Sequence, residues 1–132
     1  MNTFRLLRPE ELLDQWENLN RLLLPALDRS NGELLPDDIR DLVLSGRMFV
    51  FTDGEFAVTT EFVFYPRRTV MVAGFGAGKV PDRAVVESVL TEFARRGGAV
   101  AIQTYCKDPA MLRYYRRWFH LTPTYTLLEK QL

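Results

Sequence analysis

Residues 48–80 read MFVFTDGEFAVTTEFVFYPRRTVMVAGFGAGKV, and this stretch decides the fold. Its apolar residues recur with the period of two that is typical of β-strands. Asp53-Gly54 is a strong hairpin-turn signal, and Pro66-Arg67-Arg68 turns the chain a second time. The stretch therefore predicts a three-stranded antiparallel meander with one strongly apolar face. The expected strands cover residues 48–51, 56–65 and 69–75.

The chain before the meander predicts a strand over residues 3–8 and then two helices. Pro9 opens the first helix, and Leu12, Trp16, Leu19 and Leu23 follow at helical spacing as one buried stripe. Pro25 is expected to kink or end this helix, because proline lacks the N–H that the helix needs. The remaining signals are a turn at Ser30-Asn31-Gly32, a helix start at Pro36-Asp37-Asp38 and a stop at Gly46.

The chain after the meander alternates helices and strands. A glycine loop over residues 74–79 is expected to lead through Pro81-Asp82 into a helix that Gly97-Gly98 ends. A buried-looking strand over residues 99–105 then completes a parallel crossover with the meander. Asp108 and Pro109 are a good N-cap and first residue for a last helix. A final strand is expected over residues 122–128.

Composition limits the class of protein. The 132 residues, 47% of them hydrophobic, fit one domain over residues 1–132 with one substantial core. Seventeen basic residues balance seventeen acidic ones, so no net positive field favours nucleic acid or an anionic membrane. The single cysteine cannot form an internal disulfide, and no long apolar run predicts a signal peptide or membrane span. A soluble, unexported protein is expected.

The predicted order of elements resembles the GNAT superfamily of N-acetyltransferases over nearly the whole chain. Many members carry an Ala, a Tyr four residues later and a Gly-Phe pair four residues after that, followed by a strand that ends near a Lys. Here Ala110, Tyr114, Trp118-Phe119 and Lys130 stand in those places, and Trp118 replaces the glycine. Thr60-Glu61 with Tyr65-Pro66 looks like the corresponding strand of GNAT-like proteins of short-tailed bacteriophages. The resemblance implies an α+β (α/β three-layer) fold, in which an antiparallel meander joins a parallel strand pair and four helices cover the sheet.

The resemblance also implies an acetyl-CoA site at the glycine loop. Members hold the CoA pyrophosphate with backbone N–H groups at the start of the following helix, so Gly76, Ala77, Gly78 and Lys79 are the candidate cofactor-binding residues. This sequence departs from the family pattern at Ala73, where Gln or Arg is usual. Asp82 also brings a negative charge close to the anion site. A simple turn that uses the glycines for positive φ explains the same residues.

Other nucleotide-binding motifs do not fit this loop. A P-loop needs glycine at the position of Ala73 and Ser or Thr at that of Val80. The dinucleotide fingerprint needs a third glycine where Lys79 or Pro81 stands. Both nucleotide motifs are therefore excluded.

Two residues are candidates for acetyl-transfer chemistry, which needs a base for the amine and an acid for the departing thiolate. Tyr114 stands where the family often places the general acid, although a shift of one residue would exchange it with Tyr115. Glu61, in the middle of its predicted strand, could act as the base. The alternatives are a half-buried aromatic residue on an amphipathic helix and a solvated strand glutamate. The separation of strands 69–75 and 99–105 decides whether the pantetheine arm could enter, since Phe75, Tyr105 or Trp118 could fill it.

Other reactive residues predict less. His120 is the only histidine, so neither a triad nor a metal site is expected. Cys106 ends the predicted strand 99–105, which favours a buried inert thiol. Arg113, Arg116 and Arg117 predict a solvated basic helix face, with docking to a partner as the alternative.

These observations favour a GNAT-fold phage-type protein with a degenerate acyl-CoA site. Its expected role is that of a non-catalytic virion or interaction protein, with other phage or host proteins as partners. It would act in the host cytoplasm or in the virion. The alternative is an active acetyl-CoA-dependent N-acetyltransferase that modifies a protein or a small amine.

Overall fold

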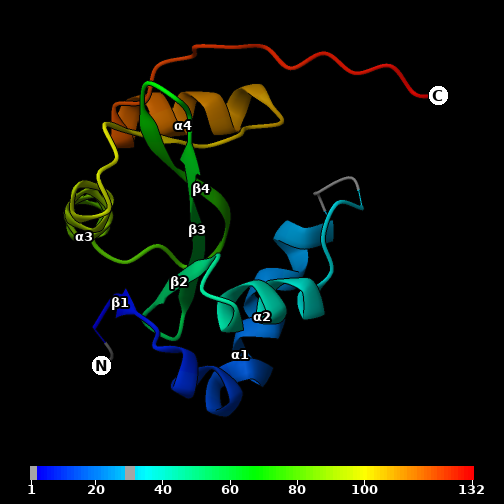
Figure 1. The fold of residues 1–132 in the computed structure, drawn as a ribbon, viewed down its shortest axis with the longest axis vertical. Coiled ribbons are helices and arrows are strands. Elements are labelled where there is room, and N and C mark those ends of the chain that lie inside the picture. The colour runs from blue at the N-terminus through cyan, green and yellow to red at the C-terminus, as the bar shows by residue number, and fades with distance from the viewer. Residues whose placement is uncertain (1–2, 29–31) are drawn as a thin grey trace.

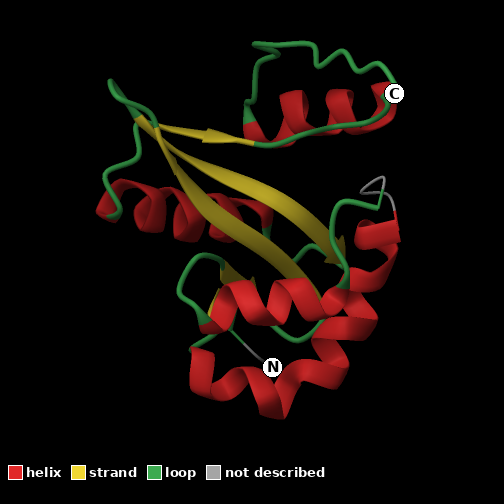
Figure 2. Ribbon diagram, turned by 45° about the vertical axis from the view of Figure 1, so that its right-hand side comes forward, coloured by secondary structure: helices red, strands yellow, loops and turns green. Residues whose placement is uncertain are grey.

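The computed structural model describes residues 3–28 and 32–132. A mixed sheet stands between helices (Figures 1 and 2). In chain order the elements are β1 (Arg5–Leu6), α1 (Pro9–Asp28), α2 (Pro36–Leu44), β2 (Phe49–Thr52), β3 (Phe56–Phe64), β4 (Thr69–Gly78), α3 (Arg83–Arg96), β5 (Ala101–Gln103) and α4 (Pro109–Phe119).

The sheet has five strands in the order β1-β2-β3-β4-β5. The first four are antiparallel, and β5 lies parallel to β4, with Val70 opposite Ala101 and Val72 opposite Gln103. The β2–β3 turn forms where Asp53-Gly54 predicts it. The Asp53 carboxylate accepts hydrogen bonds from the N–H groups of Glu55 and Phe56, and Gly54 has a φ of 96°. The predicted meander joined to a parallel pair is confirmed.

Helices cover both faces of the sheet (Figure 1). On one face, α1 and α2 pack with Val50 and Ala57 in one apolar cluster. On the other, α3 packs with Val58 and Met71 in a second cluster. Because both faces are covered, all residues from Phe56 to Thr60 are buried. The sequence predicted one apolar face, but at this end of β3 both faces are buried.

The prediction that Pro25 kinks or ends the first helix was wrong about the end, since α1 continues to Asp28 with Pro25 inside it. Proline costs the helix a backbone hydrogen bond. Leu22 and Leu23 before it and Ala26 and Leu27 after it are all buried, so burial on both sides offsets that cost. Of the turn predicted at residues 30–32, Ser30 and Asn31 lie outside the described residues, and Gly32 has a φ of 76°.

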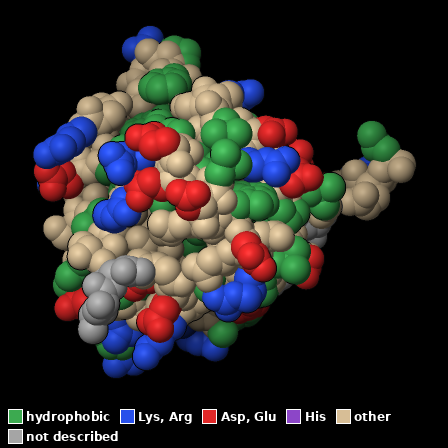
Figure 3. Space-filling view, turned by 90° about the horizontal axis from the view of Figure 1, so that it is seen from below, with side chains coloured by type: hydrophobic (Ala, Val, Ile, Leu, Met, Phe, Trp, Pro, Cys, Tyr) green, Lys and Arg blue, Asp and Glu red, His purple; other side chains and the backbone are tan. Residues whose placement is uncertain are grey.

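Two further predictions for the C-terminal part are corrected. The strand expected over residues 99–105 is only Ala101–Gln103, and its residues are half-buried. Residues 122–128, expected as a strand, form no strand, because no described strand lies beside them. They run past α4, and the chain end projects from the body at the right of Figure 3.

The exterior matches the balanced composition. On the face in Figure 3, acidic and basic side chains are interspersed, with no large area of a single sign. Among the described residues, no helix has the length and apolar character needed to cross a membrane.

Glu11 ties β1 to the start of α1. Its carboxylate forms an ion pair with Arg5 at 2.6 Å and a second with Arg8 at 3.1 Å, and it accepts the Arg8 backbone N–H. The hydrogen bond from the Arg5 side chain is the largest cause that holds the pKa of Glu11 well below its usual range. A carboxyl group with a lowered pKa stabilises the folded state above its ordinary pKa and loses that contribution as the pH falls.

Glu11→Gln is therefore expected to lower the melting temperature at pH 7. The difference from the natural chain should shrink as the pH falls below about 4.3, the ordinary pKa of glutamate. Glu10→Gln is the matched control, because Glu10 has only an exposed contact with Arg8 at 3.9 Å. Thermal unfolding from pH 3 to pH 7 measures both variants. Equal effects of the two substitutions at pH 7 would contradict this role of Glu11.

Candidate functional site

The glycines predicted as a loop belong to a strand. Gly76, Ala77 and Gly78 are the last residues of β4 and pair in register with Val58, Ala57 and Phe56 of β3. The loop prediction was wrong because an irregularity between Val58 and Thr60 shifts the register and lets β4 continue. The proposed binding of a cofactor by these residues stays a prediction.

The hydrogen bond of Lys79 fixes where these glycines direct their backbone groups. The Lys79 N–H donates to the Glu55 carbonyl at 3.0 Å, so the two residues form a hydrogen-bonded pair. Pairs of this kind alternate along an antiparallel ladder. Gly76 and Gly78 therefore direct their N–H and C=O groups away from β3, toward the opposite edge of β4.

That opposite edge of β4 is only partly occupied by β5. Pairing ends at Val72 and Gln103, and the Thr104 hydroxyl then donates to the Ala73 carbonyl at 2.7 Å. Beyond Ala73 no strand of the described chain pairs with this edge. The backbone groups of Gly76 and Gly78 thus lie along a part of this edge that no strand of the described chain covers.

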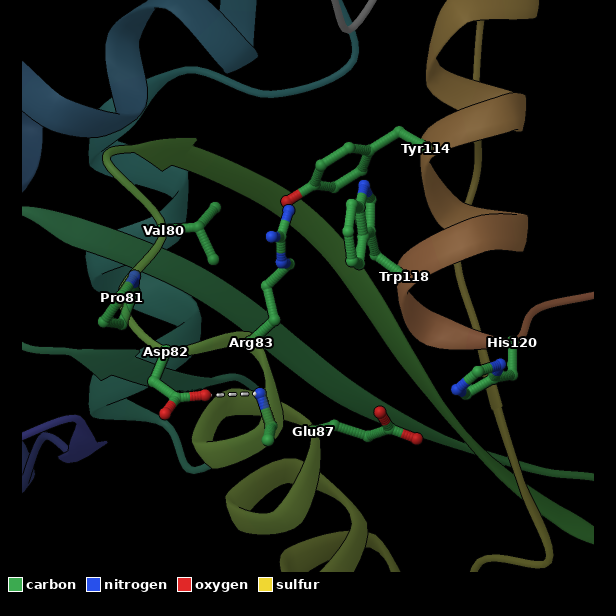
Figure 4. Close-up of a pocket in the computed structure, with 9 residues that line it drawn as sticks. Val80, Pro81, Asp82, Arg83, Glu87, Tyr114, Trp118 and His120 are labelled. Atoms are coloured by element: carbon green, nitrogen blue, oxygen red, sulfur yellow. Dashed lines mark hydrogen bonds between the residues drawn. The ribbon is translucent and has the colours of Figure 1, made fainter.

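A pocket of about 590 Å³ lies where the start of α3 approaches α4 (Figure 4). Its lining residues are Val80, Pro81, Asp82, Arg83, Ala84, Glu87, Tyr114, Trp118 and His120. The Asp82 carboxylate caps α3 and accepts the Ala84 N–H at 2.9 Å. One of the donors that a helix start offers to an anion is therefore already bound to a carboxylate.

A stacked pair crosses the pocket between the two helices. The guanidinium of Arg83 lies 3.5 Å from the centre of the Trp118 ring, and that of Arg117 lies 4.9 Å from it. In Figure 4 the hydroxyl end of Tyr114 points toward Arg83. The pocket thus combines the Arg83 cation and the rings of Tyr114 and Trp118 with the carboxylates of Asp82 and Glu87.

The three aromatic residues considered for the space beside β4 lie in different places. Phe75 packs against the α1 side of the core, and Tyr105 is 69% exposed. Trp118 lines the pocket under Arg83. Of these three residues, only Trp118 therefore lines the pocket.

The structure does not bring the two predicted catalytic residues together. Tyr114 lines the pocket, whereas Tyr115 is absent from its lining. Glu61 is exposed on β3 and, four residues after Ala57, lies on the face of the sheet that α1 covers. The pocket lies toward α3, on the other face. Their roles as general acid and base stay predictions.

The other candidate residues are placed as follows. Lys79 is exposed and does not line the pocket. His120 lines it and ends α4 in the left-handed conformation, with a φ of 56°. Cys106 is exposed, which corrects the prediction of a buried thiol, because β5 ends before reaching it. Within the described residues no group of three or more His, Cys, Asp or Glu could hold a metal ion.

Sequence reasoning missed Arg83, Glu87 and the pairing of Arg83 with Trp118. Arg83 directly follows the helix cap Asp82, next to the expected anion site, and this position could have identified it as a candidate site residue. The stack also requires α4 to pack close to α3, and no local sequence pattern predicts that packing.

Comparison with known proteins defines the class of fold. No protein-family model matches the sequence, and no curated protein matches it significantly. The solved structures that match include GNAT-type acetyltransferases, and the chain has their fold.

Three of these structures are similar over nearly their full length. One is an aminoglycoside acetyltransferase from an uncultured soil metagenomic sample, solved with sisomicin; identity is 13%, coverage 98% of this chain and 95% of that one, and the TM-score 0.69. A ribosomal-protein-alanine N-acetyltransferase from Brucella melitensis biovar Abortus 2308 has 12% identity, 98% and 99% coverage, and a TM-score of 0.67. An acetyltransferase from Trypanosoma brucei has 14% identity, 100% coverage of both chains, and a TM-score of 0.63.

The end of β4 offers a stability test. Gly78 has a φ of 103°, and a Cβ atom there would lie 2.1 Å from the Glu55 carbonyl oxygen. Gly78→Ala is therefore expected to lower the free energy of unfolding by about 3 kcal/mol, measured by urea denaturation. Gly76→Ala is the control, because its Cβ would meet side chains at ordinary distances of 3.7 and 3.8 Å. Similar losses in both variants would argue against this close approach of β4 to Glu55.

Proposed function

We propose that this chain is a GNAT-fold protein with a degenerate acyl-CoA site, which binds partners and does not transfer acetyl groups. The observation that carries this proposal is the Asp82 carboxylate at 2.9 Å from the Ala84 N–H. A helix start attracts phosphate through free N–H groups and a partial positive charge. Here the carboxylate takes one of those groups and adds a negative charge that repels phosphate. The residues at the start of α3 therefore do not fit an acyl-CoA pyrophosphate.

The positions of the candidate catalytic residues support the same proposal. Acetyl transfer needs an acid and a base that both reach one reacting centre. Tyr114 faces the pocket beside Arg83, whereas Glu61 lies on the α1 face of the sheet. The described residues around the pocket offer only Asp82, Glu87 and His120 as substitutes. Asp82 is engaged as the helix cap.

The free edge of β4 favours a second candidate, an active acetyl-CoA-dependent N-acetyltransferase. The backbone groups of Gly76 and Gly78 face this edge and could bind the amide-containing arm of CoA, while Tyr114 would serve as the acid. The acceptor would be a small amine or a protein, as the names of two similar structures suggest for those proteins.

Calorimetry with acetyl-CoA distinguishes the two candidates. The natural chain is expected to give no saturable binding at millimolar ligand. Asp82→Ser keeps a capping oxygen and removes the charge, so weak binding is expected to appear in this variant. Asp108→Ser is the matched control, because Asp108 caps α4 through the Met111 N–H at 2.9 Å and does not line the pocket.

Two results would decide against the degenerate site. Saturable binding of acetyl-CoA to the natural chain would overturn it, and acetyl transfer to an amine would establish the second candidate. If neither Asp82→Ser nor the natural chain binds acetyl-CoA, the Asp82 charge is not what prevents binding.

We further infer that the chain acts in a short-tailed bacteriophage, in the virion or the host cytoplasm, with phage or host proteins as partners. The support is the resemblance at Thr60-Glu61 and Tyr65-Pro66. Mass spectrometry of purified particles of the encoding phage is expected to detect the chain at the abundance of structural proteins. Its absence from particles and abundance in infected cells would reject the virion role.

A further inference from the structure

The end of the sheet at the β3–β4 turn extends past the helix that covers it. On the α3 face of β3, the half-buried Phe62 packs against the backbone of Gly97, where α3 ends; a Cβ atom on Gly97 would lie 2.3 Å from the Phe62 ring. Phe64 follows two residues later on the same face and stacks on Phe62, with ring centroids 6.4 Å apart. It lies beyond the end of α3 and is 74% exposed.

Two further apolar side chains are exposed at this end of the molecule. Phe64 pairs with Thr69 across the β3–β4 ladder, and the Val100 N–H donates to the Thr69 carbonyl at 3.0 Å. Val100 is 72% exposed, and Tyr65, next to Phe64 in the chain, is 53% exposed. In Figures 1 and 2 the connection from α3 to β5 runs beside the β3–β4 turn. Single exposed apolar residues are ordinary, but a group of them at one place marks an interaction site.

Four arginines lie at the same end of the molecule. Arg67 and Arg68 belong to the β3–β4 turn, and Arg95 and Arg96 to the last turn of α3. All four are exposed, and Arg96 forms an ion pair with Glu92 at 2.7 Å. Within residues 3–28 and 32–132, no acidic side chain pairs with the other three. We call Phe64, Tyr65 and Val100 with these four arginines the hairpin-end patch.

We propose that the hairpin-end patch binds an acidic protein segment that also carries a large apolar side chain. The apolar side chain would cover Phe64 and Val100, and carboxylates would pair with the arginines around them. An apolar centre with a charged rim is the usual arrangement of a protein interface. Arginine suits the rim because its planar guanidinium binds a carboxylate through two parallel hydrogen bonds. This inference names the surface and the partner class for the proposed interaction role, and it rests on that role.

The charges favour this partner over a second copy of the chain or a nucleic acid. Two copies that met through this patch across a two-fold axis would bring arginines against arginines, which repel. Nucleic acids are held through many phosphate contacts, whereas the whole chain has a formal net charge of +0. Val100 can neither pair with a phosphate nor stack on a base, but it can pack against an apolar protein side chain.

The patch is separate from the pocket between α3 and α4. The pocket lies at the start of α3 and the patch at its end, and no residue of the patch lines the pocket. The helix has 14 residues and is about 21 Å long at ~1.5 Å per residue. Substitutions in the patch therefore leave the residues around the pocket in place.

The test uses the synthetic peptide Glu-Glu-Leu-Phe-Glu-Glu, with both ends blocked, titrated into the isotope-labelled full-length chain and followed by NMR. We expect saturable shift changes confined to residues 62–69 and 95–101. A peptide with Gln in place of Glu, and one with Ser in place of Leu and Phe, should each bind about tenfold more weakly. Binding of the acidic peptide should also weaken as the salt concentration rises.

Two variants test the two parts of the patch. Arg67→Glu combined with Arg68→Glu reverses two charges, and Phe64→Ser removes the central ring; each change is expected to weaken peptide binding about tenfold. Arg47→Glu is the matched control, because Arg47 is exposed just after α2 and lies outside the patch. It should bind the peptide like the natural chain. Circular dichroism checks that every variant is folded.

Several results would overturn this proposal. They are the absence of saturable shifts at millimolar peptide, equal affinity for the Gln peptide, and full binding by both folded patch variants. Tighter binding of single-stranded oligothymidine to the same residues would assign the patch to nucleic acid and overturn it as well. Calorimetry with acetyl-CoA keeps the two proposals apart. Failure of the peptide without acetyl-CoA binding removes this inference alone, whereas acetyl transfer by a chain that binds the peptide removes the degenerate site alone.

Discussion

The register shift between β3 and β4 is the constraint on which the rest of the structure depends. The Thr59 hydroxyl accepts the Phe75 N–H at 3.0 Å and so bonds a group that the shifted ladder leaves unpaired. A shift of one residue reverses which backbone groups face the neighbouring strand. Before it, β4 directs the groups of Thr69 and Ala73 toward β5; after it, Gly76 and Gly78 face the open edge. This shift thus decides where β4 pairs with β5 and where its outer edge has no neighbouring strand in the described chain.

Much of the fold could be predicted because its signals are local. The Asp53-Gly54 turn, the helix start after Asp82, the cap Asp108 and the stop at Gly97 depend on a few neighbouring residues, and all are found. The errors arose where distant packing outweighs local preference. Burial carries α1 through Pro25, and pairing with β3 turns an expected glycine loop into strand. Residues 122–128 have strand preference but no neighbouring strand in the described chain.

The candidate site was predictable in part for the same reason. Tyr114 was singled out because the family resemblance implies a tyrosine four residues after Ala110, and it lines the pocket. The stack of Arg83 on Trp118 joins residues of two helices and needs the tertiary approach of α3 to α4. Glu61 was a reasonable candidate from strand position, yet the face that it occupies depends on which helices cover the sheet. Its role as a base therefore could not be judged from the sequence.

The parallel pairing of β4 with β5 also bears on the order of folding. The β2–β3 and β3–β4 hairpins join segments that are neighbours in the sequence. Val72 pairs with Gln103 only when the long loop between them closes. Contacts between distant residues form slowly because loop closure costs entropy before any bond is made. The meander and α1 can therefore assemble first, and β5 and α4 add last to a finished scaffold. Detachment of the C-terminal part would then uncover the α3 side of the core, against which Ile102 and Phe119 pack, and would leave the α1 side covered.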